Sequence, residues 1–315
     1  MTVRLSRGRA LTILAAAPAT LLPAPASAQA SAVRIGSTPS DSFAQPYFAA
    51  DQGYFTRAGL TATISNFTAG GPIVQACAAG AIDVGIADSI AIANAVHGGV
   101  PFALFAGSAF YSSSAPTTLL CVTKTSPLRT AKDIEGQTVA VANISSISTV
   151  AVKAWLEASG ADLAKIKLFE LPQAEMAAAL VRGTVAAAFL NETFFTSERE
   201  RLRVFSAPYD AVGKQFMISG WFATRDWLTR NADLAKRLTQ AIYESSRWAN
   251  GHHDQTAAIL AKYSGMDVAR IREIHRVNFA TGLEPRMFQP VLDVATKYKL
   301  IEGKVSAADL IFNVA

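Results

Sequence analysis

The sequence contains few of the residues that usually build metal sites or reactive centres. Its 315 residues include only two cysteines and four histidines, and their spacing fits no zinc-binding pattern. We therefore expect no bound metal and no cofactor. Cys77 and Cys121 could form a disulfide in an oxidising compartment, but they fall in different halves of the chain, which favours two buried free thiols.

The chain also lacks a strong charge excess, with 29 basic against 24 acidic residues. Three of the 29 precede an apolar run over residues 10–22, which is followed by Ala26, Ser27 and Ala28. This order is typical of a secretory signal peptide, so we expect residues 1–28 to be removed and the product to be free in the periplasm. The remaining 26 basic residues form no cluster, which argues against nucleic-acid binding. No later apolar run approaches the length of a transmembrane span.

What the sequence does contain is an α/β pattern, which is clearest over residues 67–89. Two glycines and a proline open a short helix, and Gly80 ends it. An apolar strand over 83–87 follows and leads to the polar Asp88 and Ser89. In an open parallel sheet, the carboxyl ends of strands and the amino ends of helices meet at one crevice, where ligands bind.

A similar unit of helix, glycine, apolar strand and two polar residues follows over 171–192. Aligning Gly80 with Gly183 places Asp88 opposite Asn191. The strand–loop–helix unit that precedes each of them repeats as well. Two similar α/β halves, each with polar loops at its strand ends, predict two lobes that face one cleft.

The order of elements predicts where one lobe gives way to the other. The segment 108–116 is rich in serine and contains proline, which fits a crossing segment or hinge. A single strand over 216–224 is expected to return to the first lobe. We therefore expect a discontinuous first lobe, 33–112 with 217–315, and a second lobe over 113–216.

Four further predictions concern helices. One continuous helix is expected over 43–56, a second over 150–159 after the loop 143–149, and a polar helix around 198–201. The C-terminal part is expected to be a helical tail, because it shows 3.6-residue periodicity with charged outer faces. We find no catalytic constellation in that tail.

Three motifs resemble those of a known family. They are G-Y-F-T-R-A-G-L at 53–60, A-G-A-I-D-V-G at 79–85 and K-D-I-E-G-Q-T-V-A-V at 132–141. In this order, behind a signal peptide, they are similar to periplasmic solute-binding proteins of the nitrate, sulfonate and taurine class. That class includes the binding proteins for thiamine-pyrimidine precursors. The resemblance covers about residues 33–287.

The resemblance implies an α/β protein with the type II periplasmic-binding fold, in which two lobes and a two-segment hinge close around a small solute. We expect a monomer that is not an enzyme and that delivers its solute to a membrane ABC permease and its ATPase. The preferred solute is a small nitrogen-bearing or heterocyclic one, similar to a thiamine-pyrimidine precursor.

The family's binding residues lie on the loops after the first three strands of each lobe. Carried over residue by residue, they correspond in the first lobe to Thr38, Ser40, Asp41, Ser42, Thr68, Gly70, Gly71, Asp88 and Ser89. In the second lobe they correspond to Asn143, Ser145, Ser146, Ser148, Thr149, Asn191 and Glu192. The family often has W-E-P where this chain has Asn191, Glu192 and Thr193, so the glutamate is kept but the aromatic residue and the proline are missing.

The polar residues of these loops have two interpretations. Serine and threonine before a helix can act as N-caps, or they can hold a polar or anionic ligand group together with the helix N–H groups. Asp41, Asp88 and Glu192 can likewise stabilise helix starts. Because the loops contain no Lys or Arg, three carboxylates would oppose an anion and favour a ligand with amino groups or N–H donors.

Aromatic residues near these loops are expected to lie mainly in the core. One or two of them could stack on a flat ligand ring. The candidates are Phe43, Tyr47, Phe67, Phe110, Tyr111, Phe194 and Trp221.

Three alternatives stay open. The same transport role could serve an alkanesulfonate, taurine or nitrate anion. The chain could be an enzyme similar to the eukaryotic thiamine-pyrimidine synthase, which shares this fold but is marked by a cysteine-rich cluster that is absent here. It could also be a sensor lobe that reports a solute to a membrane kinase through the same closure.

Overall fold

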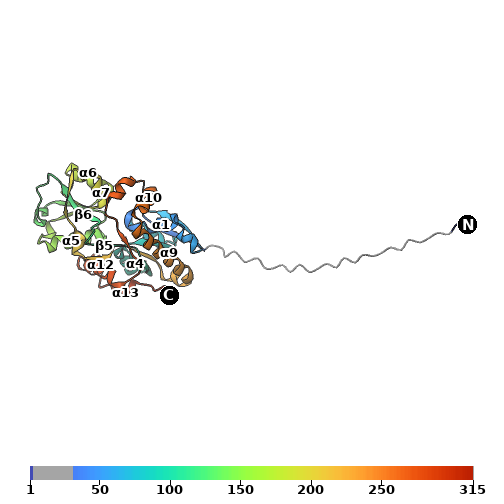
Figure 1. The fold of residues 1–315 in the computed structure, drawn as a ribbon. Helices are drawn as coiled ribbons and strands as arrows, with labels where there is room; N and C mark the ends of the chain where they lie inside the picture. The colour runs from blue at the N-terminus through green and yellow to red at the C-terminus, as the bar shows by residue number, and fades with distance from the viewer. Residues whose placement is uncertain (3–30, 315) are drawn as a thin grey trace.

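The computed structural model describes residues 1–2 and 31–314. Apart from its first two residues, the expected signal peptide over 1–28 therefore lies outside the described residues. In the described part, two five-stranded sheets form the centres of two α/β lobes, and a three-stranded sheet joins them. Figure 1 shows α5, α6, α7 and β6 on one side of the molecule and α1, α9 and α10 on the other, with β5 between them.

The first lobe is built on a sheet with the order β2-β1-β3-β12-β4. Strand β1 pairs in parallel with β2 and β3, whereas β12 is antiparallel to β3 and β4. The strands are β1 (Ser31–Ser37), β2 (Leu60–Asn66), β3 (Val84–Ala87), β4 (Phe102–Gly107) and β12 (Gly220–Thr224). The helices that connect them are α1 (Gln45–Asp51), α2 (Tyr54–Arg57), α3 (Gly70–Ala78) and α4 (Ser89–His97).

The second lobe has a sheet with the order β8-β7-β9-β6-β10. Its strands are β6 (Thr118–Thr123), β7 (Thr138–Val141), β8 (Lys167–Glu170), β9 (Ala187–Asn191) and β10 (Leu202–Ser206). Its helices are α5 (Ile147–Ala158), α6 (Gln173–Arg182) and α7 (Glu192–Ser197). Short 3-10 turns complete it at η2 (Ala131–Ile134), η3 (Leu163–Lys165) and η4 (Pro208–Ala211).

The two sheets have the same topology. In each, three parallel strands (β2-β1-β3 or β8-β7-β9) are followed by an antiparallel strand that arrives through a crossing segment (β12 or β6). Gly80 and Gly183 follow α3 and α6 with φ of 70° and 73°, a left-handed conformation that favours glycine. Asp88 and Asn191 are the N-cap residues of α4 and α7. The predicted repeat is thus confirmed.

The hinge is a small antiparallel sheet of β5 (Ala109–Ser112), β11 (Gln215–Met217) and β13 (Asn278–Phe279). Strands β5 and β11 belong to the two segments that cross between the lobes. The prediction of one strand over 216–224 is wrong, because the strand is interrupted between β11 and β12. The N–H groups of Ile218 and Ser219 both donate to the carbonyl oxygen of Ala109, so the chain shifts register as it passes from the hinge into the first sheet.

Three helix predictions need correction. The helix expected over 43–56 is divided into η1 (Asp41–Phe43), α1 and α2, because Gly53 adopts a φ of 71° that interrupts a right-handed helix. Residues 198–201 form a turn, since the helix of this region, α7, starts directly at the end of β9. Helix α5 begins earlier than expected, at Ile147, and so includes Ser148 and Thr149.

The helical tail is confirmed. It consists of α8 (Arg225–Arg230), α9 (Ala232–Gly251), α10 (His253–Ser264), α11 (Val268–Glu273), α12 (Pro285–Lys297) and α13 (Ala307–Leu310). Helices α9 and α10 pack on α1 of the first lobe, but α11 contacts α7 and α12 contacts α5 of the second lobe. Among the described residues, no helix is long and apolar enough to cross a membrane.

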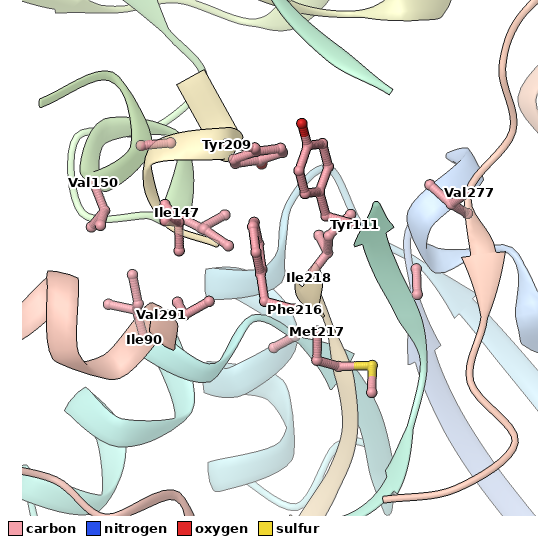
Figure 2. Close-up of a cluster of buried hydrophobic side chains, with 14 of the residues drawn as sticks. Ile90, Tyr111, Ile147, Val150, Tyr209, Phe216, Met217, Ile218, Val277 and Val291 are labelled. Atoms are coloured by element: carbon pink, nitrogen blue, oxygen red, sulfur yellow. The ribbon is translucent and has the colours of Figure 1, made fainter. Parts of the chain in front are cut away.

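A hydrophobic cluster extends from one lobe to the other through the hinge. The ring of Tyr111 on β5 lies 5.2 Å from that of Phe216 on β11 and 5.2 Å from that of Tyr209 in η4. Figure 2 shows these three rings lying together. Cys77 and Cys121 are both buried and free, which confirms the expected thiols. Burial raises the pKa of each to about 12, so neither is a reactive thiolate near neutral pH.

Candidate binding cleft

A cleft of about 680 Å³ lies between the lobes. Its walls are the segments that follow β1, β2 and β3 of the first sheet and β7, β8 and β9 of the second. These are carboxyl ends of parallel strands, where the amino ends of the next helices also point. The cleft therefore receives exposed backbone N–H groups from both lobes.

Twelve of the residues predicted for the site line this cleft. They are Thr38, Ser40, Ser42, Thr68, Gly70, Gly71, Asp88, Asn143, Ser145, Ser146, Ser148 and Asn191. The structure thus brings together residues that are far apart in the sequence.

Two of the predicted carboxylates instead accept hydrogen bonds from the C-terminal part of the chain. Asp41 accepts hydrogen bonds from Arg276 Nε at 2.7 Å and from the backbone N–H of Val277 at 2.8 Å. Glu192 accepts one from the backbone N–H of His275 at 3.0 Å. Neither carboxylate lines the cleft. The prediction of three free carboxylates that would oppose an anion is therefore wrong, because Arg276 of the tail neutralises Asp41.

Two predicted hydroxyls also lie outside the cleft. Ser89 is buried in the first turn of α4. Thr149 is fully buried, and its hydroxyl donates to the carbonyl oxygen of Asn143 at 3.0 Å. Thr149 faces the protein interior because α5 starts earlier than predicted, at Ile147.

Asp88 is the carboxylate that remains in the cleft. Its Oδ1 accepts hydrogen bonds from the N–H groups of Ile90 and Ala91 at 3.0 and 3.1 Å, which caps α4. Its Oδ2 faces the amino end of α3, 3.9 Å from the position of a Cβ atom on Gly70. Burial raises the pKa of Asp88, although these N–H donors lower it. The capping interpretation is thus correct for Asp88, and it leaves Oδ2 turned toward the cleft wall.

The amino end of α5 lacks a side-chain cap. The hydroxyl of Ser146, the N-cap residue, donates to the carbonyl oxygen of Asn143 at 2.9 Å and lies 2.7 Å from the hydroxyl of Ser148. The capping interpretation is therefore wrong for Ser146. The first-turn N–H groups of α5 have no side-chain acceptor and lie at the cleft wall formed by Ile147 and Ser148.

Helix α3 offers a second uncapped amino end, from the first lobe. Its N-cap is Ala69, which has no polar side chain, and Gly70 and Gly71 form its first turn. A Cβ atom at Gly71 would meet no other atom within 4 Å, so this position borders open space. Uncapped helix ends favour negative or acceptor-rich groups, and here two such ends come from opposite lobes.

Most of the aromatic candidates named from the sequence do not line the cleft. Tyr47, Tyr111 and Trp221 are fully buried in the core, as expected for most of the candidates. Phe43 and Phe194 line the cleft.

Tyr209 also lines the cleft, although the sequence did not indicate it. Its ring packs edge-on against Tyr111 and Phe216 of the hinge and against Phe189 of β9. The segment after β10 carried no signal other than Pro208, which indicated only a loop. The hinge strands that place Tyr209 could not be paired from the sequence.

Several polar lining residues were missed for a different reason. Gln75 and Asn94 lie in the second turns of α3 and α4, Gln173 starts α6 and Thr118 starts β6. The predicted site residues were confined to loops and helix starts after the strands. The Gln173 side chain accepts from the Asn191 N–H at 3.0 Å and donates to the Phe189 carbonyl oxygen at 3.1 Å. It thereby fixes the end of β9 at which Asn191 enters the cleft.

The polar groups that line the cleft are hydroxyls, side-chain amides and one carboxylate. Among the described residues that line it there is no Cys, His, Lys or Arg, so no side chain present could act as an imidazole base or a thiolate nucleophile. The described residues also include no group of three or more His, Cys, Asp or Glu side chains placed to hold a metal ion.

Solved structures with a similar fold include proteins that bind small anions. The periplasmic aliphatic sulphonate binding protein SsuA from Escherichia coli matches with a TM-score of 0.74 at 21% identity, covering 90% of this chain and 92% of that chain. The periplasmic nitrate-binding protein NrtA from Synechocystis PCC 6803 matches with a TM-score of 0.71 at 13% identity, covering 89% and 84%. The desulfurization enzyme DSZB matches with a TM-score of 0.68 at 13% identity, covering 90% and 96%.

These likenesses confirm the predicted type II periplasmic-binding fold. A comparison with curated protein sequences gave no match. The family model described as NMT1/THI5 like matches residues 40–279, which is most of the chain and includes segments of both lobes and the hinge. The protein therefore belongs to the NMT1/THI5-like family.

Proposed function

We propose that the protein is the substrate-binding component of an ABC importer and works in the periplasm, where it delivers a small solute to a membrane permease and its ATPase. The observation that carries this proposal is the cleft of about 680 Å³ that both lobes line above a two-strand crossing. Two lobes on a hinge can enclose a ligand by closure. The relatives of this fold that are named as periplasmic sulphonate- and nitrate-binding proteins support the same role.

The proposal includes the limits of the lobes and the absence of catalysis. The first lobe comprises residues 33–112 and 217–315, the second comprises 113–216, and the working form is a monomer. DSZB has the same fold, but the described lining residues of this cleft offer no thiol and no imidazole. A sensor role would use the same closure, and a permease gene beside this one would favour transport.

The ligand follows from the distribution of donors and acceptors. The uncapped ends of α3 and α5 offer N–H groups to an oxygen-rich group, whereas Asp88 offers an acceptor to an N–H donor. Apolar side chains such as Val74 and Ile147 complete the wall. A small organic solute that carries both kinds of group fits best. An aminosulfonate and an amino-substituted heterocycle are the two classes to compare.

A thermal-shift screen with matched pairs of solutes tests this proposal. Taurine and ethanesulfonate share a sulfonate and differ in one amino group, and 4-amino-2-methylpyrimidine differs from 2-methylpyrimidine in the same way. A true ligand raises the melting temperature in a saturable manner, and we expect the amino-bearing member of a pair to raise it more. Equal shifts in melting temperature within both pairs would show that Asp88 does not bind the amino group of the ligand. No saturable shift from sulfonates, nitrate, amines, pyrimidines or aromatic acids would contradict the transport role.

A further inference from the structure

The C-terminal tail makes a contact that spans the two lobes. Residues 274–277, which we call the strap, connect α11 to the hinge strand β13. In the strap, the backbone N–H of His275 donates to Glu192 Oε2 at 3.0 Å, and Nδ1 of the same histidine lies 3.3 Å from that oxygen. Glu192 is the first residue of α7 in the second lobe, and its side chain is only 13% exposed.

The strap is attached to the first lobe at two points. Arg276 pairs with Asp41 at 2.6 Å, and its side chain is only 6% exposed. Val277 donates its backbone N–H to the same carboxylate at 2.8 Å. Further along, β13 pairs with β5. The strap is therefore held to the first lobe and the hinge whether or not α7 is in contact with it.

Two other charge pairs of the tail cross the same boundary. Lys297 on α12 pairs with Glu157 on α5, and both side chains are about half exposed. Arg199, just after α7, lies 3.4 Å from Glu273 at the end of α11. Both of these side chains are more than half exposed, so this pair is weak. Figure 1 shows α7 beside the orange helices of the tail, in agreement with the contact between α7 and α11. Glu192 is the least exposed carboxylate of the three pairs, although the side chain of His275 is itself mostly exposed.

The Glu192 carboxylate is stabilised by His275 and opposed by burial and by the Asp41 carboxylate. Burial raises the pKa of Glu192, and the charge and N–H of His275 lower it, while the nearby Asp41 carboxylate raises it further. Arg276 neutralises Asp41 and so limits that repulsion. If α7 moves away from the strap, Glu192 loses both contacts to His275, whereas Asp41 keeps Arg276.

We infer that His275 and Glu192 form an interlobe latch that holds the cleft closed in the absence of ligand, and that the strap is its fixed half. Opening turns the second lobe about β5 and β11, which separates Glu192 from His275 but leaves the pair of Arg276 and Asp41 intact. The latch thereby sets the ratio of open to closed empty protein.

The test measures the distance between the lobes in ligand-free protein. Lys167 on β8 and Lys236 on α9 are exposed, so Lys167→Cys and Lys236→Cys carry spin labels for double electron–electron resonance, while the buried Cys77 and Cys121 react slowly. Glu192→Gln keeps the size of the side chain and removes its charge. We expect Glu192→Gln and His275→Ala each to raise the open-to-closed ratio about fivefold, with no further rise in the double variant.

The control is a second His–Glu pair within the first lobe. His97 lies 3.0 Å from Glu302, and Glu302→Gln should leave the distance distribution unchanged. An unchanged distribution in Glu192→Gln would overturn the latch, and so would an equal change in the control. Because the measurement needs no ligand, its failure would leave the proposed transport role intact.

Discussion

Arg276→Leu tests whether Asp41 has a structural role, as its contacts indicate. The substitution removes the cation that lies 2.6 Å from Asp41 Oδ1 and leaves the carboxylate with the N–H of Val277. Asp41 is only 13% exposed, so little water can replace the guanidinium. Removing one partner of a buried ion pair typically costs 3–5 kcal/mol, and we expect about 3 kcal/mol here because leucine retains part of the packing.

That loss should lower the melting temperature by about 6 °C, at the roughly 2 °C per kcal/mol that applies to a chain of this size. The assay is thermal unfolding of the ligand-free protein. Asp41→Asn should be destabilising by itself, yet Arg276→Leu should cost less in the Asp41→Asn background, because the uncharged amide needs no counter-ion. A melting temperature within about 1 °C of wild type for Arg276→Leu would refute this reasoning.

Three further predictions follow from the core and the cleft. Gly85→Ala should destabilise the protein by about 1–3 kcal/mol, because its Cβ would overlap Ile73 and lie 2.9 Å from Phe222; Gly71→Ala, with open space around it, should unfold at the wild-type temperature. Asp88→Asn should gain stability relative to wild type as the pH rises from about 4 to about 7 in thermal scans. Because burial raises the pKa of Asp88, the contribution of this group to the free energy of unfolding is fully present below the unfolded pKa of 3.8 and is lost above the folded pKa. A stability difference between variant and wild type that stays constant with pH would contradict the buried position. Cys77 and Cys121, with pKa values raised to about 12, should react with a disulfide reagent only after unfolding, and fast reaction in the native state would show that they are accessible.

The repeated α/β unit explains how much of the fold could be predicted. Apolar strands that end at Asp88 and Asn191, with a glycine before each, have the same local pattern in both lobes, and local pattern depends on nearby residues alone. The points at which a helix is interrupted were harder to predict. Gly53 stands inside an otherwise helical pattern, and nothing local distinguishes a tolerated glycine from one that adopts a positive φ.

The candidate site was predictable where it depends on the ends of strands. Loop residues such as Thr68 and Asn143 reach the cleft because parallel strands end on one edge of a sheet. The roles of Asp41 and Glu192 could not be predicted, because their partners Arg276 and His275 are brought in by a tail more than 80 residues away in sequence. Tyr209 was missed for the same reason, since its place depends on the pairing of β5 with β11.

Titration calorimetry tests the central claim most directly, using the solute that gives the largest thermal shift. The comparison is between the wild type and Gly71→Trp, which places a large side chain in the cleft at a position where an added Cβ atom meets no other atom within 4 Å. The account predicts one binding site per chain in the wild type and loss of binding in a variant that melts at the same temperature. Unchanged affinity in Gly71→Trp would show that the solute binds elsewhere and would contradict the account.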